Sequence, residues 1–288
     1  MKTLYKIKKG LDLKLKGEAT AKLSAAALSS EYAVMPADFP GIVPRTVVKE
    51  GDNVLAGQAL FVDKATERVQ FVSPVSGTVV GVERGERRKL LRFRIKANET
   101  QEFKDFGVKD LSKLTGDEVK ELMLESGLFA FMRQRPYDVV ANPNEAPKAI
   151  FVSAFNKMPL AADFGVVVKC FEQDFKLGIR ALAKIAKVHL GICPEQINSE
   201  ILPIEEAEVS VFDGPNPSGN VGVQMVACNV EYSIAEVSPG GKSSYIIGYS
   251  GSVTLQNFGS ESAKIYQSKL QLVIDGFKQT LTAGFKDE

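Results

Sequence analysis

The sequence predicts an α/β chain (α+β overall), in which a small all-β domain precedes a domain built on a parallel sheet. Residues 41–85 repeat one pattern, a short β-branched run that ends in a glycine turn, which is typical of a flattened barrel or sandwich with two similar halves. Residues 148–155, KAIFVSAF, form an apolar run that favours a buried strand. Helical periodicity and a second strand pattern follow this run, as in a β-α-β unit.

We expect three segments along the chain: a β domain over 1–105, a helix and proline-rich connector over 106–147, and an α/β domain with a C-terminal tail over 148–288. The 288 residues are 44% hydrophobic and 25% charged, which is ordinary for a soluble globular protein with two cores. A net charge of +1 gives no general attraction to nucleic acid or anionic lipid. No apolar run is long enough to span a bilayer or to act as a signal peptide, so we expect a cytoplasmic location.

Within the β domain, residues 7–19 alternate apolar and basic side chains and predict a strand that joins this domain. A second short strand is expected over 32–36, where a proline stops it. Residues 85–95 read as a basic turn followed by an alternating strand. The charges of this turn favour either a solvated hairpin face or a docking patch.

The connector begins with a helix. Thr115 and Glu118 have the spacing of a capping box, and Gly127 interrupts or ends the helical pattern. Prolines and asparagines between residues 136 and 147 then indicate an extended segment. Arg133 and Arg135 flank it and are candidates to hold an anionic group or a partner carboxylate; a salt link between domains is the alternative.

In the α/β domain we expect a helix over 174–190, with His189 near its end in a structural role. A strand over 209–212 leads into the glycine-rich loop 213–222, whose backbone amides could approach an anionic or planar ligand. Asn216, Gly219 and Gly222 are the candidate ligand-binding residues of this loop. Its glycine spacing matches neither the dinucleotide fingerprint nor a P-loop.

The remaining chemistry-bearing residues predict no catalytic group and no metal site. The three cysteines are widely spaced, without a C-x-x-C motif, and there is one histidine. We expect Cys170 and Cys193 to be small buried hydrophobes and Asp163 to cap the segment that follows it. The tail predicts strands over 245–249 and 252–255, and an amphipathic helix over 263–277 that packs on the α/β core.

One motif of the β domain resembles a known domain type. The sequence V-K-E-G-D-x-V-x-x-G-Q-x-L-F-x-x-D-K-A, followed by S-P-V-S-G-T-V, is similar to biotinyl/lipoyl-carrier domains of the barrel-sandwich type. The resemblance places Lys64 at the position that carries the swinging cofactor. The interval from Lys64 to Pro74 is about two residues longer than in those carriers, and a modifying ligase reads the geometry of this tip. We therefore expect Lys64 to be an ordinary exposed lysine.

The order of motifs across residues 5–225 resembles the A-subunit family of sodium-translocating NADH:quinone reductases. The motifs are I-K-K-G-L-D-L, the carrier-like sequence, G-E-R-R, L-E-S-G-L, R-x-R-P-Y, P-x-A-I-F-V-S-A-F, P-L-A-A-D and G-P-N-P-S-G-N-V-G. The resemblance implies a barrel-sandwich domain and a Rossmann-like domain. It also implies a peripheral protein on the cytoplasmic side of the inner membrane that takes part in quinone binding and assembly. Quinone would be the substrate, no cofactor would be bound covalently, and the flavins and NADH would be bound by other subunits.

Two departures from that family bear on function. The usual G-P-H-P is G-P-N-P here, with Asn216 in place of the histidine, and the tail from Val226 onward does not follow the family pattern. We expect a truncated, divergent or rearranged member whose isolated chain is inactive. The alternatives are a lipoyl- or biotin-type carrier, a non-catalytic scaffold, and the C-subunit of Rnf-type electron-transport complexes, although the cysteine clusters of that protein are missing.

Overall fold

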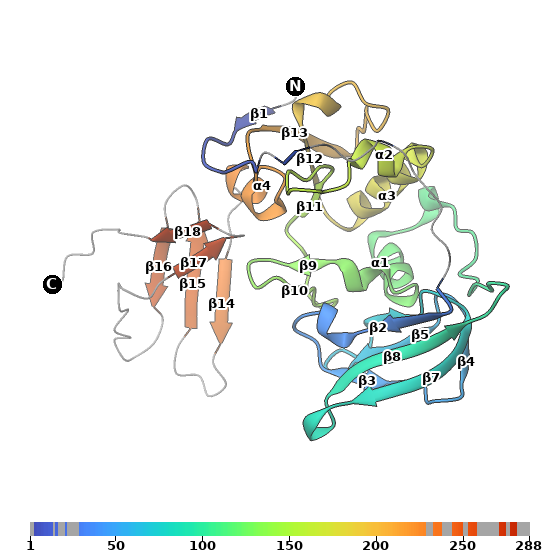
Figure 1. The fold of residues 1–288 in the computed structure, drawn as a ribbon. Helices are drawn as coiled ribbons and strands as arrows, with labels where there is room; N and C mark the ends of the chain where they lie inside the picture. Colours follow the sequence, from blue (N-terminus) through green and yellow to red (C-terminus); the bar gives the residue numbers. More distant parts are fainter. Residues whose placement is uncertain are drawn as a thin grey trace. The chain divides into compact units, whose positions relative to one another are not determined.

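A computed structural model describes residues 3–13, 15–16, 21 and 29–228, and beyond them the backbone of five strands between 233 and 280. The chain divides into two compact units, which Figure 1 shows as ribbons. The β unit comprises residues 23–150 and 177–187. The α/β unit comprises residues 1–22, 151–176 and 188–288.

The β unit is built around two antiparallel sheets. One has the strand order β2-β8-β7-β4 and the other the order β3-β5-β6, as expected for a barrel-sandwich made of two similar halves. The strands are β2 (Glu31–Val34), β3 (Pro44–Thr46), β4 (Asn53–Val54), β5 (Ala59–Asp63), β6 (Gln70–Val72), β7 (Gly77–Arg84) and β8 (Leu90–Ala97).

Stacked phenyl rings fill the centre of this unit. Phe61 lies parallel to Phe71 and Phe93, with ring centroids 4.6 and 5.0 Å apart. All three side chains are buried, as are Val79 and Ile95 from the facing strands. Because each such ring removes a large apolar area from water, burial of these residues favours folding of the unit.

The predicted helix and connector belong to the same core. Helix α1 (Gly116–Glu125) begins with the expected capping box, and Gly127 follows its end in the left-handed region, with φ 77°. The turn η4 (Leu128–Phe131) and the short hairpin β9 (Arg133–Gln134) with β10 (Val139–Val140) come next. Apolar residues of α1, η4 and β10 pack into the core of the β unit, which makes this segment part of a folded body.

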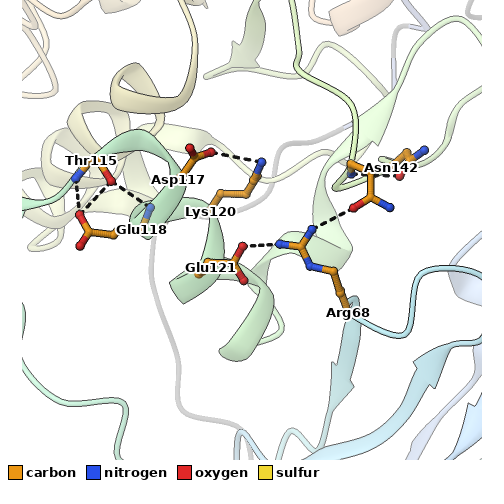
Figure 2. A network of polar contacts seen from close by, with 8 residues as sticks. Arg68, Thr115, Asp117, Glu118, Lys120, Glu121 and Asn142 are labelled. Carbon is orange, nitrogen blue, oxygen red and sulfur yellow. Dashed lines mark hydrogen bonds and ion pairs between the residues drawn. The ribbon is translucent and has the colours of Figure 1, made fainter.

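A polar network fastens the segment to the β5–β6 hairpin (Figure 2). The guanidinium of Arg68 contacts the carboxylate of Glu121 on α1 and donates to Asn144 Oδ1 at 2.9 Å. Asn142 in turn donates to Glu145 Oε1 at 2.9 Å. These contacts explain why a proline- and asparagine-rich stretch is ordered.

The α/β unit contains a four-stranded sheet with the order β1-β13-β12-β11. Strands β11 (Ile150–Ser153) and β13 (Ala207–Asp213) are the two that the sequence predicts. The first strand, β1 (Thr3–Lys6), pairs in parallel with β13. Residues 7–13, 15 and 16 contain no strand, so the prediction of a strand over 7–19 that joins the β domain is wrong where the structure describes this segment. The pattern of a short strand does not specify its partner, and here the partner lies about 200 residues further along the chain.

The central strand β12 (Val188–Ile192) is buried along its whole length, as in the interior of a parallel sheet. The predicted helix over 174–190 is therefore too long: α3 spans Glu172–Ile185. His189 lies in β12 instead of at a helix end. Its ring stacks on Phe151 with centroids 4.5 Å apart, and its Nδ1 lies 3.5 Å from Glu208 Oε2.

The α/β unit also contains two shorter helices. Asp163 caps α2 (Phe164–Val168) by accepting from Val166 N–H at 3.0 Å, as predicted. Helix α4 (Val221–Ala227) follows the glycine-rich loop. No helix among the described residues combines the length and apolar character needed to cross a bilayer.

In the tail, two predicted strands are confirmed and the predicted helix is not. Strand β15 lies between β14 and β16 in an antiparallel sheet. The predicted helix over 263–277 is contradicted where the backbone is described, because residues 271–274 and 277 are in strands; residues 263–270 lie outside the described residues. The tail strands are β14 (Ser233–Val237), β15 (Ser244–Tyr249), β16 (Val253–Asn257), β17 (Gln271–Ile274) and β18 (Phe277–Thr280).

Candidate functional site

The loops after β11, β12 and β13 gather at the carboxyl edge of the parallel sheet. This edge is where open α/β sheets bind ligands, because the strand ends leave a crevice between neighbouring loops. The glycine-rich loop 213–222 leaves β13 here and leads into α4. This loop is therefore the candidate site of the α/β unit.

The N-terminal segment holds this loop in place. Ile7 N–H donates to Asp213 O at 2.8 Å and Leu11 N–H to Asn216 O at 2.9 Å. The Asp12 carboxylate accepts from Asn216 N–H at 2.8 Å. The two chain segments approach so closely that a Cβ added at Gly10 would lie 2.2 Å from Asn216 O. Two motifs far apart in the sequence therefore form one structure.

A buried side-chain carboxamide, that of Gln224, contacts the loop. Gln224, on α4, is only 1% exposed, and its Nε2 donates to Ser153 Oγ at 2.9 Å and to Ser218 O at 3.1 Å. The hydroxyl of Ser153 lies 2.9 Å from Gly219 O. This network joins β11, the loop and α4. Since buried polar groups are costly without partners, it fixes the position of the loop.

Four of the eight backbone N–H groups of the loop are already engaged. Ser218 N–H and Asn220 N–H donate to Pro215 O and Pro217 O, both at 2.8 Å. Gly222 N–H donates to the side chain of Asn220 at 2.8 Å, and Asn216 N–H goes to Asp12. These four donors are not available to a phosphate. Recognition by this loop would depend mainly on its side chains.

The neighbouring loop after β11 adds an apolar surface and a second amide. A Cβ at Gly219 would lie 2.8 Å from Phe155 O, so glycine permits the two loops to touch. Asn156 is exposed and accepts from Met158 N–H at 2.8 Å. Met158 and Leu160 are 59% and 85% exposed. The edge thus combines carboxamide groups with exposed apolar side chains.

The two candidate arginines lie in the β unit, where each contacts other residues of that unit. Arg133 donates to Asp38 O at 3.0 Å, and Arg135 Nη2 lies 3.7 Å from Asp138 Oδ1. Asn216, Gly219 and Gly222 lie in the α/β unit. Neither unit therefore brings all five predicted residues together in one place.

Lys64 lies at the start of the β5–β6 turn, not at its apex. Its backbone N–H donates to Val43 O at 2.7 Å, which extends the pairing of β3 with β5. The buried carboxylate of Asp63 accepts from Val43 N–H at 3.1 Å and from Thr66 N–H at 3.2 Å. Glu67, with φ 55°, closes the turn. The Lys64 side chain is exposed, but its main chain is tied to the neighbouring strand.

The cysteines differ from one another. Cys193 is buried, as predicted, and burial is the main reason that its pKa is raised to about 11. Cys170 is exposed, which contradicts the prediction of a buried position; it has φ 71° and lies between α2 and α3. Among the described residues no group of three His, Cys, Asp or Glu side chains is placed to hold a metal ion.

Sequence reasoning missed Asp12, Ser153 and Gln224 as parts of this site. Gln224 did carry a signal, because it is the one polar side chain in the apolar helix VGVQMVA. A single amide among apolar residues often has a buried partner. Asp12 gave no local signal, since its partner is 204 residues away in sequence.

Comparisons with known proteins match both units. A family model described as the NqrA N-terminal barrel-sandwich hybrid domain matches residues 5–98. A second, described as the NqrA second alpha/beta domain, matches residues 114–250. The second match extends past Val226, so the family pattern continues further than the sequence motifs predicted.

Curated relatives carry the name of the A-subunit of Na(+)-translocating NADH-quinone reductase. The relative from Marinomonas sp. (strain MWYL1) is 34% identical over 224 residues, which cover 77% of this chain and 50% of the relative. The relative from Neisseria meningitidis (strain Z2491) is 34% identical over 227 residues, with the same coverage. That from Glaesserella parasuis is 35% identical over 225 residues, or 76% of this chain and 50% of the relative. The chain spans about half the length of the curated relatives it matches.

Proposed function

Because the chain belongs to the NqrA family, we propose that it acts within a Na⁺-translocating NADH-quinone reductase, as a peripheral part of the complex on the cytoplasmic side of the inner membrane. The observation that carries this proposal is the match of two successive NqrA domains in one chain. The partners would be the other subunits of the complex.

Quinone binding is the contribution that the carboxyl edge of the sheet supports best. A quinone headgroup is planar and neutral, offers two carbonyl acceptors and carries an apolar tail. Such a ligand needs a few N–H donors beside apolar side chains. The carboxamides of Asn156 and Asn216 would supply the donors, and Met158 and Leu160 would contact the tail.

The redox cofactors would belong to other subunits. Hydride transfer requires a bound nicotinamide or flavin, whose pyrophosphate or phosphate needs several N–H donors. The hydrogen bonds that hold the 213–222 loop support this assignment, since they occupy four of its backbone N–H groups. This chain would then contribute quinone binding and assembly.

A photoreactive ubiquinone analogue tests the quinone site. We expect cross-links in the peptides that contain residues 155–160 and 213–222, identified by mass spectrometry and competed by unlabelled short-chain quinone. The double substitution Asn156→Ala and Asn216→Ala should abolish them. The hydrogen bonds from Asn216 to Leu11 and Asp12 are made by its backbone C=O and N–H, which alanine also has. The variant should therefore retain its fold. Asn98→Ala, at an exposed position in the β unit, is the matched control.

Two results would refute the assignment of this site. One is labelling spread evenly over the surface without competition. The other is undiminished labelling of the double variant. Assembly is tested separately, by asking whether the tagged chain co-purifies with the membrane subunits of the complex; a chain recovered alone from cells that contain those subunits would contradict it.

A further inference from the structure

The connection between β7 and β8 has an unusual sequence for its backbone geometry. Lys89 N–H donates to Glu86 O at 3.1 Å, which closes a two-residue turn at Arg87 and Arg88. Both central residues are left-handed, with φ 53° and 60°. This is the geometry of a type I′ turn, in which asparagine and glycine are strongly preferred. Two arginines at these positions oppose the local preference of the backbone.

The turn also concentrates positive charge. Arg84, Arg87, Arg88 and Lys89 are exposed, and within the described part of the chain none of them has an ion-pair partner. Glu86 is the only acidic residue between positions 84 and 91. The next acidic residue, Glu83, already pairs with Arg92 at 2.6 Å. A locally cationic tip thus exists on a chain whose net charge is only +1.

An apolar side chain accompanies these charges. Leu91 is 44% exposed, and its methyl groups lie over Gly85, where an added Cβ would be 3.2 Å away. Figure 1 shows the β7–β8 connection at the end of the β unit that is away from α1. The basic tip, defined as residues 84–91, is therefore a convex hairpin with four cations and one exposed leucine.

We propose that the basic tip binds an anionic phospholipid surface. Guanidinium groups match phosphate geometry, and long basic side chains reach a headgroup layer that adapts to a convex hairpin. The tip contains no aromatic residue, whereas protein interfaces depend on aromatic anchors and on shape complementarity. These features favour a lipid surface over an acidic protein. The inference goes beyond the proposed function, and it does not require a quinone site.

Sedimentation with vesicles tests the proposal on the whole chain. Vesicles that contain phosphatidylglycerol should bind the chain at low salt, and pure phosphatidylcholine vesicles should not. Arg87→Asn with Arg88→Gly removes two charges and installs the residues that the turn prefers, so lost binding cannot be attributed to unfolding. Each basic residue near such a surface contributes about fivefold, and the double variant should bind roughly 30-fold more weakly.

Two controls make the result specific. Arg87→Lys with Arg88→Lys keeps the charges and should retain most of the binding. Lys49→Gln with Lys109→Gln removes two exposed charges elsewhere in the β unit and should have little effect. Failure of the wild-type chain to bind anionic vesicles overturns the proposal and would leave an acidic protein face as the partner. Equal losses in the tip variant and the lysine control overturn it as well. Neither outcome depends on quinone cross-linking, so the two proposals fail separately.

Discussion

The buried carboxamide of Gln224 gives the sharpest test of how the candidate site is built. Replacing Gln224 with leucine keeps the approximate volume but removes both donated hydrogen bonds. Each bond contributes about 1 kcal/mol net, and an orphaned buried carbonyl such as Ser218 O costs about 1–3 kcal/mol more. The apolar leucine offsets part of this loss. We expect the free energy of unfolding to fall by about 2–4 kcal/mol.

Urea unfolding followed by far-UV circular dichroism measures this change, and hydrogen exchange locates it. Amides of the 213–222 loop should exchange faster in the variant, because Ser153 and the loop would lose their link to α4. Gln173→Leu is the matched control, since Gln173 lies on α3, away from this network. A loss no larger than that of the control, with unchanged exchange of the loop, would refute the reasoning.

A charge at the same position should make stability depend on pH. Gln224→Glu would bury a carboxyl group that can donate a hydrogen bond only when protonated, so its folded-state pKa would be raised above the unfolded value of about 4.3. Below that value both states are protonated and the variant keeps its stability. Above it the unfolded state loses the proton first, so the variant becomes less stable as the pH rises. Pairs of unfolding curves in mildly acidic and mildly alkaline buffer would show this; a pH-independent difference from wild type would contradict it.

Two further predictions concern reactive side chains. At mildly alkaline pH, iodoacetamide should alkylate the exposed Cys170 and spare Cys193, because only the thiolate reacts and the pKa of Cys193 is raised to about 11; equal labelling in peptide mass spectra would show that Cys193 is neither buried nor shifted. Lys64 should stay unmodified when the chain is produced with lipoyl and biotin ligases, since its main chain is tied to Val43 at the start of the turn; an added lipoyl or biotinyl mass would restore the carrier hypothesis.

The parts of the fold that sequence patterns predicted are those with strong local signals. The glycine turns of residues 41–85, the capping box at Thr115 and the apolar run of β11 each specify structure within a few residues. Strand β12 was misread because its apolar residues continue the pattern of α3 after a gap of two residues. Helical and strand periodicity cannot be distinguished over so short a run.

The candidate site was predicted in part. The glycine-rich loop was identified as a feature that follows a strand, and Gly219 does allow a close contact there. The bonds that hold the loop were not predicted, because Asp12 and Ser153 reach it from distant parts of the chain. Long-range polar contacts leave no periodic trace in a single sequence.

The pairing of β1 with β13 means that the chain leaves the parallel sheet after one strand and returns to it more than a hundred residues later. During synthesis the first strand must wait until its partner β13 has emerged, after the whole β unit. Closing so long a loop costs roughly 2–3 kcal/mol more than closing a loop of about ten residues. A fragment that starts at the second family domain would lack this strand. It would expose the edge of β13 to other chains and should aggregate unless residues 3–13 are supplied as a peptide or fused to it.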